Sequence, residues 1–172
     1  MHRTRCPISG KILSKHDCNL LSNVLKTIAF LLPDMGYCQG MNYVASSLYS
    51  DIRDEETTFN IMLSLLVSKE LKALYANGVP EYHVRQYMLD ALIKEHIPDL
   101  SLYFKRLGLN SEVLTGQWIM TMFTGFFSYP AILLILDSFF IDSWVGVFRV
   151  ALALLKLFKH ELMVSTDIAF VA

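Results

Sequence analysis

Apolar side chains recur every three or four residues along most of this 172-residue chain. They follow the polar residues 14–17 with this spacing as far as Leu32, and Pro33 comes directly after. A period near 3.6 is that of a helix with one buried face, and proline commonly follows a helix end. No stretch alternates apolar and polar residues for long enough to predict a sheet. The sequence therefore predicts an all-α fold.

Proline and glycine divide the rest of the chain into further helices. Pro80 and Pro98 each stand where a first helical turn accepts proline, because that position needs no N–H donor. Gly108 lies where a glycine cap would end the helix after Pro98. We expect about eight or nine helices with short connections, in a single domain over residues 1–172. After Pro80 the side chains expected to be buried are Val84, Tyr87, Met88, Ala91 and Leu92.

Composition narrows the classes of function. The net charge is −1 and the Lys and Arg residues are scattered, so no basic surface for nucleic acid is predicted. Three cysteines form no CxxC pair, and the polar start is not a signal peptide, which together favour a reducing, cytosolic setting.

One segment raises the alternative of a membrane protein. Residues 113–136 carry no charged side chain over a length that could span a bilayer. The other interpretation is two core helices broken near Pro130. Polar residues such as Gln117 and the lack of flanking Lys or Arg favour that second interpretation. We then expect Trp118 to be buried on an apolar face.

Few residue patterns suggest chemistry of their own. Phosphate-binding loops and the common hydrolase motifs are absent from the sequence. Cys6, His16 and Cys18 could supply three zinc ligands, but their spacing fits no usual pairing, so we predict no metal site. Asp137 and Asp142 could be acid–base groups in apolar surroundings. Their simpler roles are a hydrogen bond to a neighbouring loop for Asp137 and a cap on the following helix for Asp142.

Residues 36–42 read Gly-Tyr-Cys-Gln-Gly-Met-Asn at the expected start of an amphipathic helix. With a helix beginning near Tyr37, Tyr37 would lie on the buried face, and Gln39, about 200° from it around the axis, would point away from the core. Gly40 beside it would let another backbone or a ligand approach closely. An exposed amide can orient a water or an oxyanion, although a merely solvated glutamine is the more common explanation.

The run 37–42 resembles the YxQGMN motif of TBC-domain Rab GTPase-activating proteins. That family also carries an arginine motif, IxxDxxR, often continuing as RT, and Arg3 falls on its arginine. Residues 144–155 resemble a third block of the family, whereas residues 134–137 depart from its RIWD sequence. The resemblance covers essentially the whole chain. It implies a TBC (Rab-GAP) domain over residues 1–172, without the start of the arginine motif and without the last helices.

The resemblance implies a regulator that completes the active site of a GTPase and is not itself an enzyme. Arg3 would stabilise charge on the transferred phosphoryl group, and Gln39 would orient the attacking water. Tyr37, Gly40 and Asn42 would contact a Rab-family GTPase in its GTP-bound state.

Further expectations follow from this resemblance. Magnesium and GTP would come with the GTPase, so no cofactor is expected in this chain. We expect a monomeric, cytoplasmic protein of vesicle trafficking, without a transmembrane segment, that reaches endomembranes through its Rab partner. A Rab-binding scaffold of the same fold without activity is the alternative, because the isoleucine and aspartate before Arg3 are absent.

Overall fold

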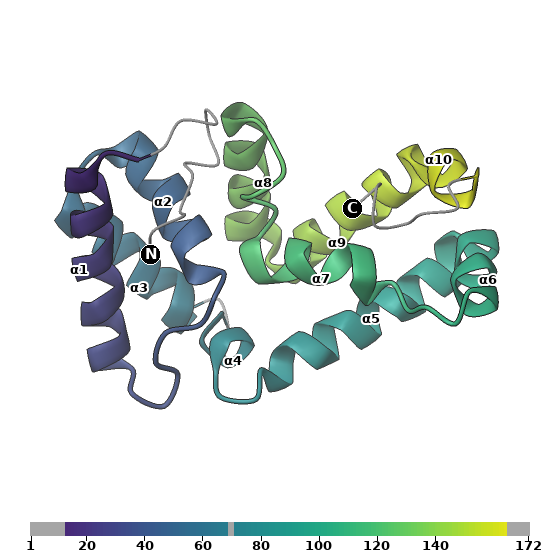
Figure 1. The fold of residues 1–172 in the computed structure, drawn as a ribbon, viewed down its shortest axis with the longest axis horizontal. Coiled ribbons are helices and arrows are strands. Elements are labelled where there is room, and N and C mark those ends of the chain that lie inside the picture. The colour runs from purple at the N-terminus through teal and green to yellow at the C-terminus, as the bar shows by residue number, and fades with distance from the viewer. Residues whose placement is uncertain (1–12, 69–70, 165–172) are drawn as a thin grey trace.

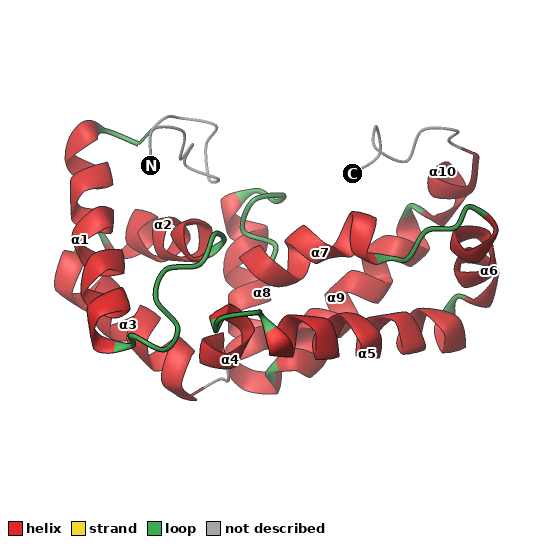
Figure 2. Cartoon of the chain, turned by 60° about the horizontal axis from the view of Figure 1, so that its bottom comes forward, coloured by secondary structure: helices red, strands yellow, loops and turns green. Residues whose placement is uncertain are grey.

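A computed structural model describes residues 13–68 and 71–164 of the chain (Figure 1). Over these residues the chain forms ten helices and no strand, which confirms the all-α prediction (Figure 2). The helices are α1 Lys15–Leu31, α2 Met41–Ile52, α3 Glu55–Ser68, α4 Leu71–Tyr75, α5 Pro80–His96, α6 Pro98–Arg106, α7 Glu112–Thr121, α8 Tyr129–Asp142, α9 Trp144–Leu157 and α10 Lys159–Val164. The short helices α4 and α10 were not anticipated from periodicity, because a single turn shows no repeat.

Helix ends follow the local sequence signals. Ser14 and Asp17 form a capping box at the start of α1: the Asp17 N–H donates to Ser14 Oγ (3.1 Å), and the Ser14 N–H donates to Asp17 Oδ2 (3.3 Å). Proline occupies the first turn of both α5 and α6, as predicted. Gly108, just after α6, has a φ of 67°, the left-handed conformation of a glycine cap.

The helices form two groups along the long axis of the molecule (Figure 1). α1, α2 and α3 pack against one another, while α5, α7, α8 and α9 form the second group, with α6 and α10 at its far end. α4 contacts both α3 and α5, and α2 contacts α7. These two links join the groups.

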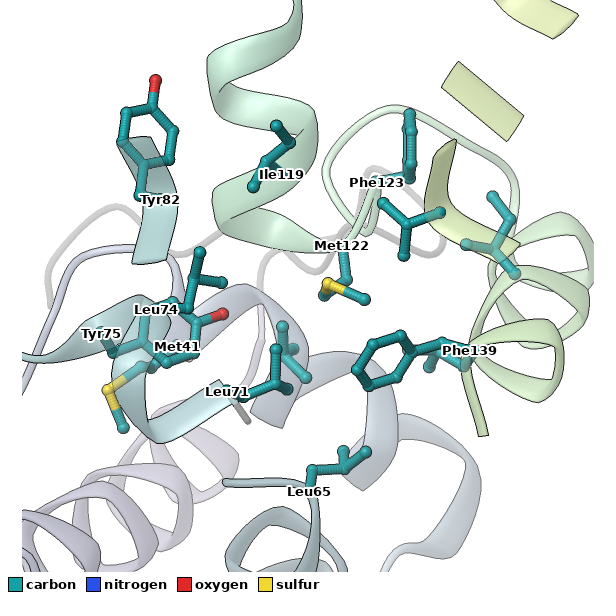
Figure 3. Close-up of a cluster of buried hydrophobic side chains, with 14 of the residues drawn as sticks. Met41, Leu65, Leu71, Leu74, Tyr75, Tyr82, Ile119, Met122, Phe123 and Phe139 are labelled. Carbon is teal, nitrogen blue, oxygen red and sulfur yellow. The ribbon is translucent and has the colours of Figure 1, made fainter. Parts of the chain in front are cut away.

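Buried side chains from both groups meet between α2, α4, α7 and α8. Met41, Leu71, Met122 and Phe139 are all fully buried there, although they come from distant parts of the sequence (Figure 3). This shared core fixes α7 against α2 and α4, and the functional loop described below lies at the same junction.

The buried face of α5 was predicted wrongly. Its buried residues are Tyr82, Gln86, Leu89 and Ile93, whereas Val84, Tyr87, Met88 and Ala91 are exposed and Leu92 is only partly buried. The reason is a polar contact that apolar periodicity does not detect. The Gln86 amide donates to Ser111 Oγ (2.7 Å) and Thr115 Oγ1 (2.9 Å) on the neighbouring helix, so this face can be buried at little cost.

The uncharged segment 113–136 forms parts of two helices, as the interpretation of two core helices predicted. α7 ends at Thr121 and α8 begins at Tyr129. Within the described ranges no helix has both the length and the apolar character needed to cross a membrane. Trp118 is only partly buried, so its expected full burial was wrong. Its ring lies at the edge of the core against Phe123 and Phe126 (centroids 5.5 and 6.4 Å away).

The two aspartates of this region face solvent. Asp137 is exposed, which does not fit an acid–base group in apolar surroundings. Asp142 ends α8 and forms an ion pair with Arg149 (2.8 Å). The predicted cap on α9 is therefore wrong: Ser143 takes the N-cap position, with no capping hydrogen bond from its side chain.

Phe139 and Ile141 on α8 allow a matched test of this core. Phe139 is fully buried, whereas Ile141 is 81% exposed. Phe139→Ala should lower the free energy of unfolding by about 3–5 kcal/mol, because it leaves a cavity in the core where its ring meets Trp144 of α9 (centroids 5.8 Å apart). Ile141→Ala should change it by less than about 0.5 kcal/mol. Equal losses from the two variants in urea unfolding would contradict this placement of α8.

Candidate functional site

The segment that joins α1 to α2 carries the glutamine singled out from the sequence. It turns sharply at its start, where the N–H groups of Met35 and Gly36 both donate to the Leu32 carbonyl (3.0 and 2.9 Å). Met35 is buried and so anchors the segment to the core. The chain then runs through Tyr37 and Gln39 to the first residue of α2.

Gln39 is exposed, as predicted, but the geometric reason was wrong. α2 begins at Met41, so Tyr37 and Gln39 precede the helix and do not share its faces. Gly40 explains this late start, because its φ of 118° lies outside the helical region. Tyr37 is consequently 52% exposed and does not belong to the buried face of α2 on which it was expected.

Gly40 is buried and lies directly against the backbone of α7. A β-carbon at this position would be 2.6 Å from the Met120 carbonyl oxygen, far inside van der Waals contact. The close approach expected at this glycine is therefore made by another backbone. This contact belongs to the junction of α2 with α7, one residue after Gln39.

The Asn42 side chain forms two hydrogen bonds within this loop. Its Oδ1 accepts hydrogen bonds from the Tyr37 hydroxyl and from the Gly40 N–H, both at 3.3 Å. The Asn42 side chain therefore holds Tyr37 and Gly40, which lie on either side of Gln39 in the sequence. The three residues predicted to contact a GTPase thus lie together, with Tyr37 outermost and Gly40 innermost.

The groups beside Gln39 are neutral near pH 7. Burial raises the pKa of the Cys38 thiol above its usual value, and burial also raises the pKa of the Tyr37 hydroxyl. Gln39 itself has a neutral amide that can donate and accept. This arrangement can orient a water or a polar group, but any positive charge must come from another residue.

The end of α7 beneath the loop has an unusual backbone. Met122 and Phe123 have φ values of 51° and 61°, in the left-handed region that non-glycine residues rarely occupy, and both are fully buried. The Met120 carbonyl accepts a hydrogen bond from the hydroxyl of Tyr75 on α4 (2.8 Å). Sequence reasoning missed Tyr75, and the available signal was weak: a buried tyrosine usually finds a partner for its hydroxyl.

Arg3, the arginine of the family motif, and Cys6, one of the three possible zinc ligands, lie outside the described residues. His16 and Cys18 are within them. Cys18 is a partly buried free thiol at the start of α1. In the portion of the chain that the structure describes, no group of three or more His, Cys, Asp or Glu residues could hold a metal ion.

The sequence model of the Rab-GTPase-TBC domain matches residues 7–163 of this chain. The chain belongs to this family. Its relatives include the Rab GTPase-activating protein tbc-11 of Caenorhabditis elegans, which is 31% identical over 83% of this chain and 15% of its own length. The human ecotropic viral integration site 5 protein homolog is 30% identical over 84% of this chain and 18% of its own length. The chain thus spans less than a fifth of the length of these two TBC relatives.

The architecture is that of a solved TBC domain. The crystal structure of the Chlamydomonas flagellar RabGAP TBC domain superposes with a TM-score of 0.78 and 25% sequence identity. The match covers 91% of this chain and 52% of that chain. The fold expected from the family resemblance is therefore confirmed.

Alanine substitutions at Gly40 and Gly78 test the close contact between Gly40 and α7. Both glycines have positive φ, but a β-carbon at Gly78 would meet nothing within 4 Å. Gly78→Ala should therefore lower the free energy of unfolding by about 1–2 kcal/mol, the cost of the left-handed conformation alone. Gly40→Ala combines the clash with Met120 and a backbone conformation (φ 118°, ψ −39°) that is less accessible to alanine than that of Gly78, and it should cost about 2–5 kcal/mol. Equal losses in urea unfolding would show that the contact with α7 contributes nothing.

Proposed function

We propose that this TBC domain accelerates GTP hydrolysis by a Rab-family GTPase, with Gln39 and Arg3 completing the active site of the GTPase. The observation that carries the proposal is the Gln39 turn. Gln39 is exposed, while Asn42 holds Tyr37 and Gly40, and Gly40 is packed against Met120. An exposed side chain on a fixed backbone suits a group that must enter a partner's active site without losing its orientation.

The chemistry of GTP hydrolysis gives the two residues different tasks. Negative charge spreads over the transferred phosphoryl group, and a slow GTPase lacks enough positive charge there; an arginine supplied in trans can be worth about 10³–10⁵ in rate. Arg3 would provide that charge. The neutral Gln39 amide would accept a hydrogen bond from the attacking water and so align it with the phosphorus.

The relatives support the partner class. The names of the tbc-11 protein of C. elegans and of the GTPase-activating protein GYP5 of Saccharomyces cerevisiae describe them as GTPase activators. We extend that activity to this chain, with a GTP-bound Rab as partner. Tyr37, half exposed beside Gln39, would contact the GTPase, whereas Gly40 and Asn42 would act by shaping the turn.

The domain would then be a regulator of an enzyme, without a cofactor of its own. Magnesium and nucleotide would arrive with the GTPase and leave with it. A monomer meeting a membrane-bound Rab would place the protein at endomembranes for as long as the complex lasts.

Gln39→Ala tests the role of the glutamine. The side chain is exposed, so the melting temperature should stay nearly unchanged. The stimulation of a Rab's GTP turnover by the domain should fall by about a hundredfold or more, because the group that aligns the water is lost. Asn60→Ala, which removes an exposed amide from α3, is the matched control and should leave turnover unchanged. If Gln39→Ala unfolds the domain, the residue is structural and this assignment fails.

Arg3→Ala should abolish activation to a similar degree, and Arg3→Lys should restore little of it, because a point charge cannot reproduce a planar two-pronged donor. The double variant with Gln39→Ala should be scarcely slower than either single variant, since both groups act on one transition state. Binding to GTP-loaded Rab should persist throughout. Independent, multiplicative losses in single-turnover hydrolysis would argue against a shared transition state.

The alternative function is a Rab-binding scaffold without activation. It would replace the present proposal if the domain bound a GTP-loaded Rab in a panel and never accelerated hydrolysis, even with residues added before Met1 to supply the Ile-x-x-Asp part of the arginine motif.

A further inference from the structure

Tyr75 is a buried side chain that the chemistry above does not use. It lies on the short helix α4 with 1% of its surface exposed, inside the cluster shared by both helix groups (Figure 3). Its hydroxyl donates to the Met120 carbonyl across 2.8 Å. Burial raises the pKa of this hydroxyl far above neutrality, so it remains protonated and able to donate.

The Met120 carbonyl needs a donor from outside its own helix. In a continuing helix the N–H of residue 124 would donate to it. Here Met122 and Phe123 turn left-handed, and the Thr124 N–H donates to Thr121 instead (3.0 Å). The Tyr75 hydroxyl therefore fixes the direction of a carbonyl at a helix end.

Gly40 lies against this same carbonyl. The oxygen that Tyr75 holds would be 2.6 Å from a β-carbon of Gly40, so a movement of the carbonyl towards Gly40 would displace the backbone next to Gln39. Cys38, on the other side of Gln39, is partly buried and packs against the core to which Tyr75 belongs. Through the Met120 carbonyl, Tyr75 is thus linked to the residue that follows Gln39.

We propose that Tyr75 is a positioning residue, whose hydrogen bond to Met120 sets the place of the Gln39 turn and so aligns the glutamine for GTP hydrolysis. This inference rests on the proposed Rab-GAP function for its catalytic consequence. Its structural part, that Tyr75 holds the turn, stands independently and can be measured without a GTPase.

Tyr75→Phe removes the hydroxyl and keeps the ring. With a responsive Rab bound to GTP, kcat should fall about tenfold, because small misplacements of a reacting group are costly, while KM stays within about twofold of the unchanged protein. Alkylation of Cys38 by iodoacetamide, read by peptide mass spectrometry, should become several-fold faster as the turn loosens. Cys18 on α1 serves as the internal reference and should keep its rate.

Tyr82→Phe is the matched control. Tyr82 is also buried, and its hydroxyl donates to Glu112 Oε1 (2.7 Å) at the opposite end of α7. This variant should lose comparable thermal stability and leave both kcat and the Cys38 rate unchanged. If Tyr75→Phe melts too low, all rates are compared at a temperature where circular dichroism shows both variants folded.

The outcomes separate this inference from the proposed function. Faster alkylation at Cys38 alone, with lower kcat, supports a positioning role. Unchanged Cys38 alkylation, equal acceleration at Cys18, or a change confined to KM overturns it. If the unchanged domain activates no Rab, the proposed function fails, and the Cys38 rates still decide whether Tyr75 holds the turn.

Discussion

The contact between Gly40 and the Met120 carbonyl is the constraint on which the site depends. It brings the start of α2 against the end of α7 at a distance that no side chain would permit. Because α2 packs with α1 and α3, while α7 packs with α5 and α9, the same contact helps to join the two groups of helices. A TBC domain that loses this contact would lose part of its core and the backbone geometry beside Gln39 together.

Hydrogen bonds and a buried anchor hold the turn, while its glutamine is exposed. The side-chain oxygen of Asn42 accepts hydrogen bonds from Tyr37 and Gly40, and the buried side chain of Met35 anchors the segment at its beginning. The conformational entropy of this backbone is therefore lost when the domain folds, and not when a partner binds. That order of events suits the role proposed for Gln39 in the active site of a GTPase.

Predictions from the sequence were correct where local signals were strong. They failed where polar or long-range contacts determine which side chains are buried or bonded. Prolines gave the starts of α5 and α6, and the family motif directed attention to Gln39. The buried face of α5 was missed because Gln86 is inside, bonded to residues 25 and 29 positions further along. Nothing local revealed Tyr75, since its partner is 45 residues away. The helical position assigned to Gln39 was wrong because the φ of Gly40 cannot be read from its neighbours.

The most direct test is a crystal structure of this domain bound to a responsive Rab carrying GDP, magnesium and aluminium fluoride, which mimics the transferred phosphoryl group. The account predicts the Gln39 amide within about 2.6–3.2 Å of the water in line with that group, with Gly40 still against Met120. A Rab bound on another face of the domain, or a Gln39 side chain turned away from the nucleotide, would contradict it.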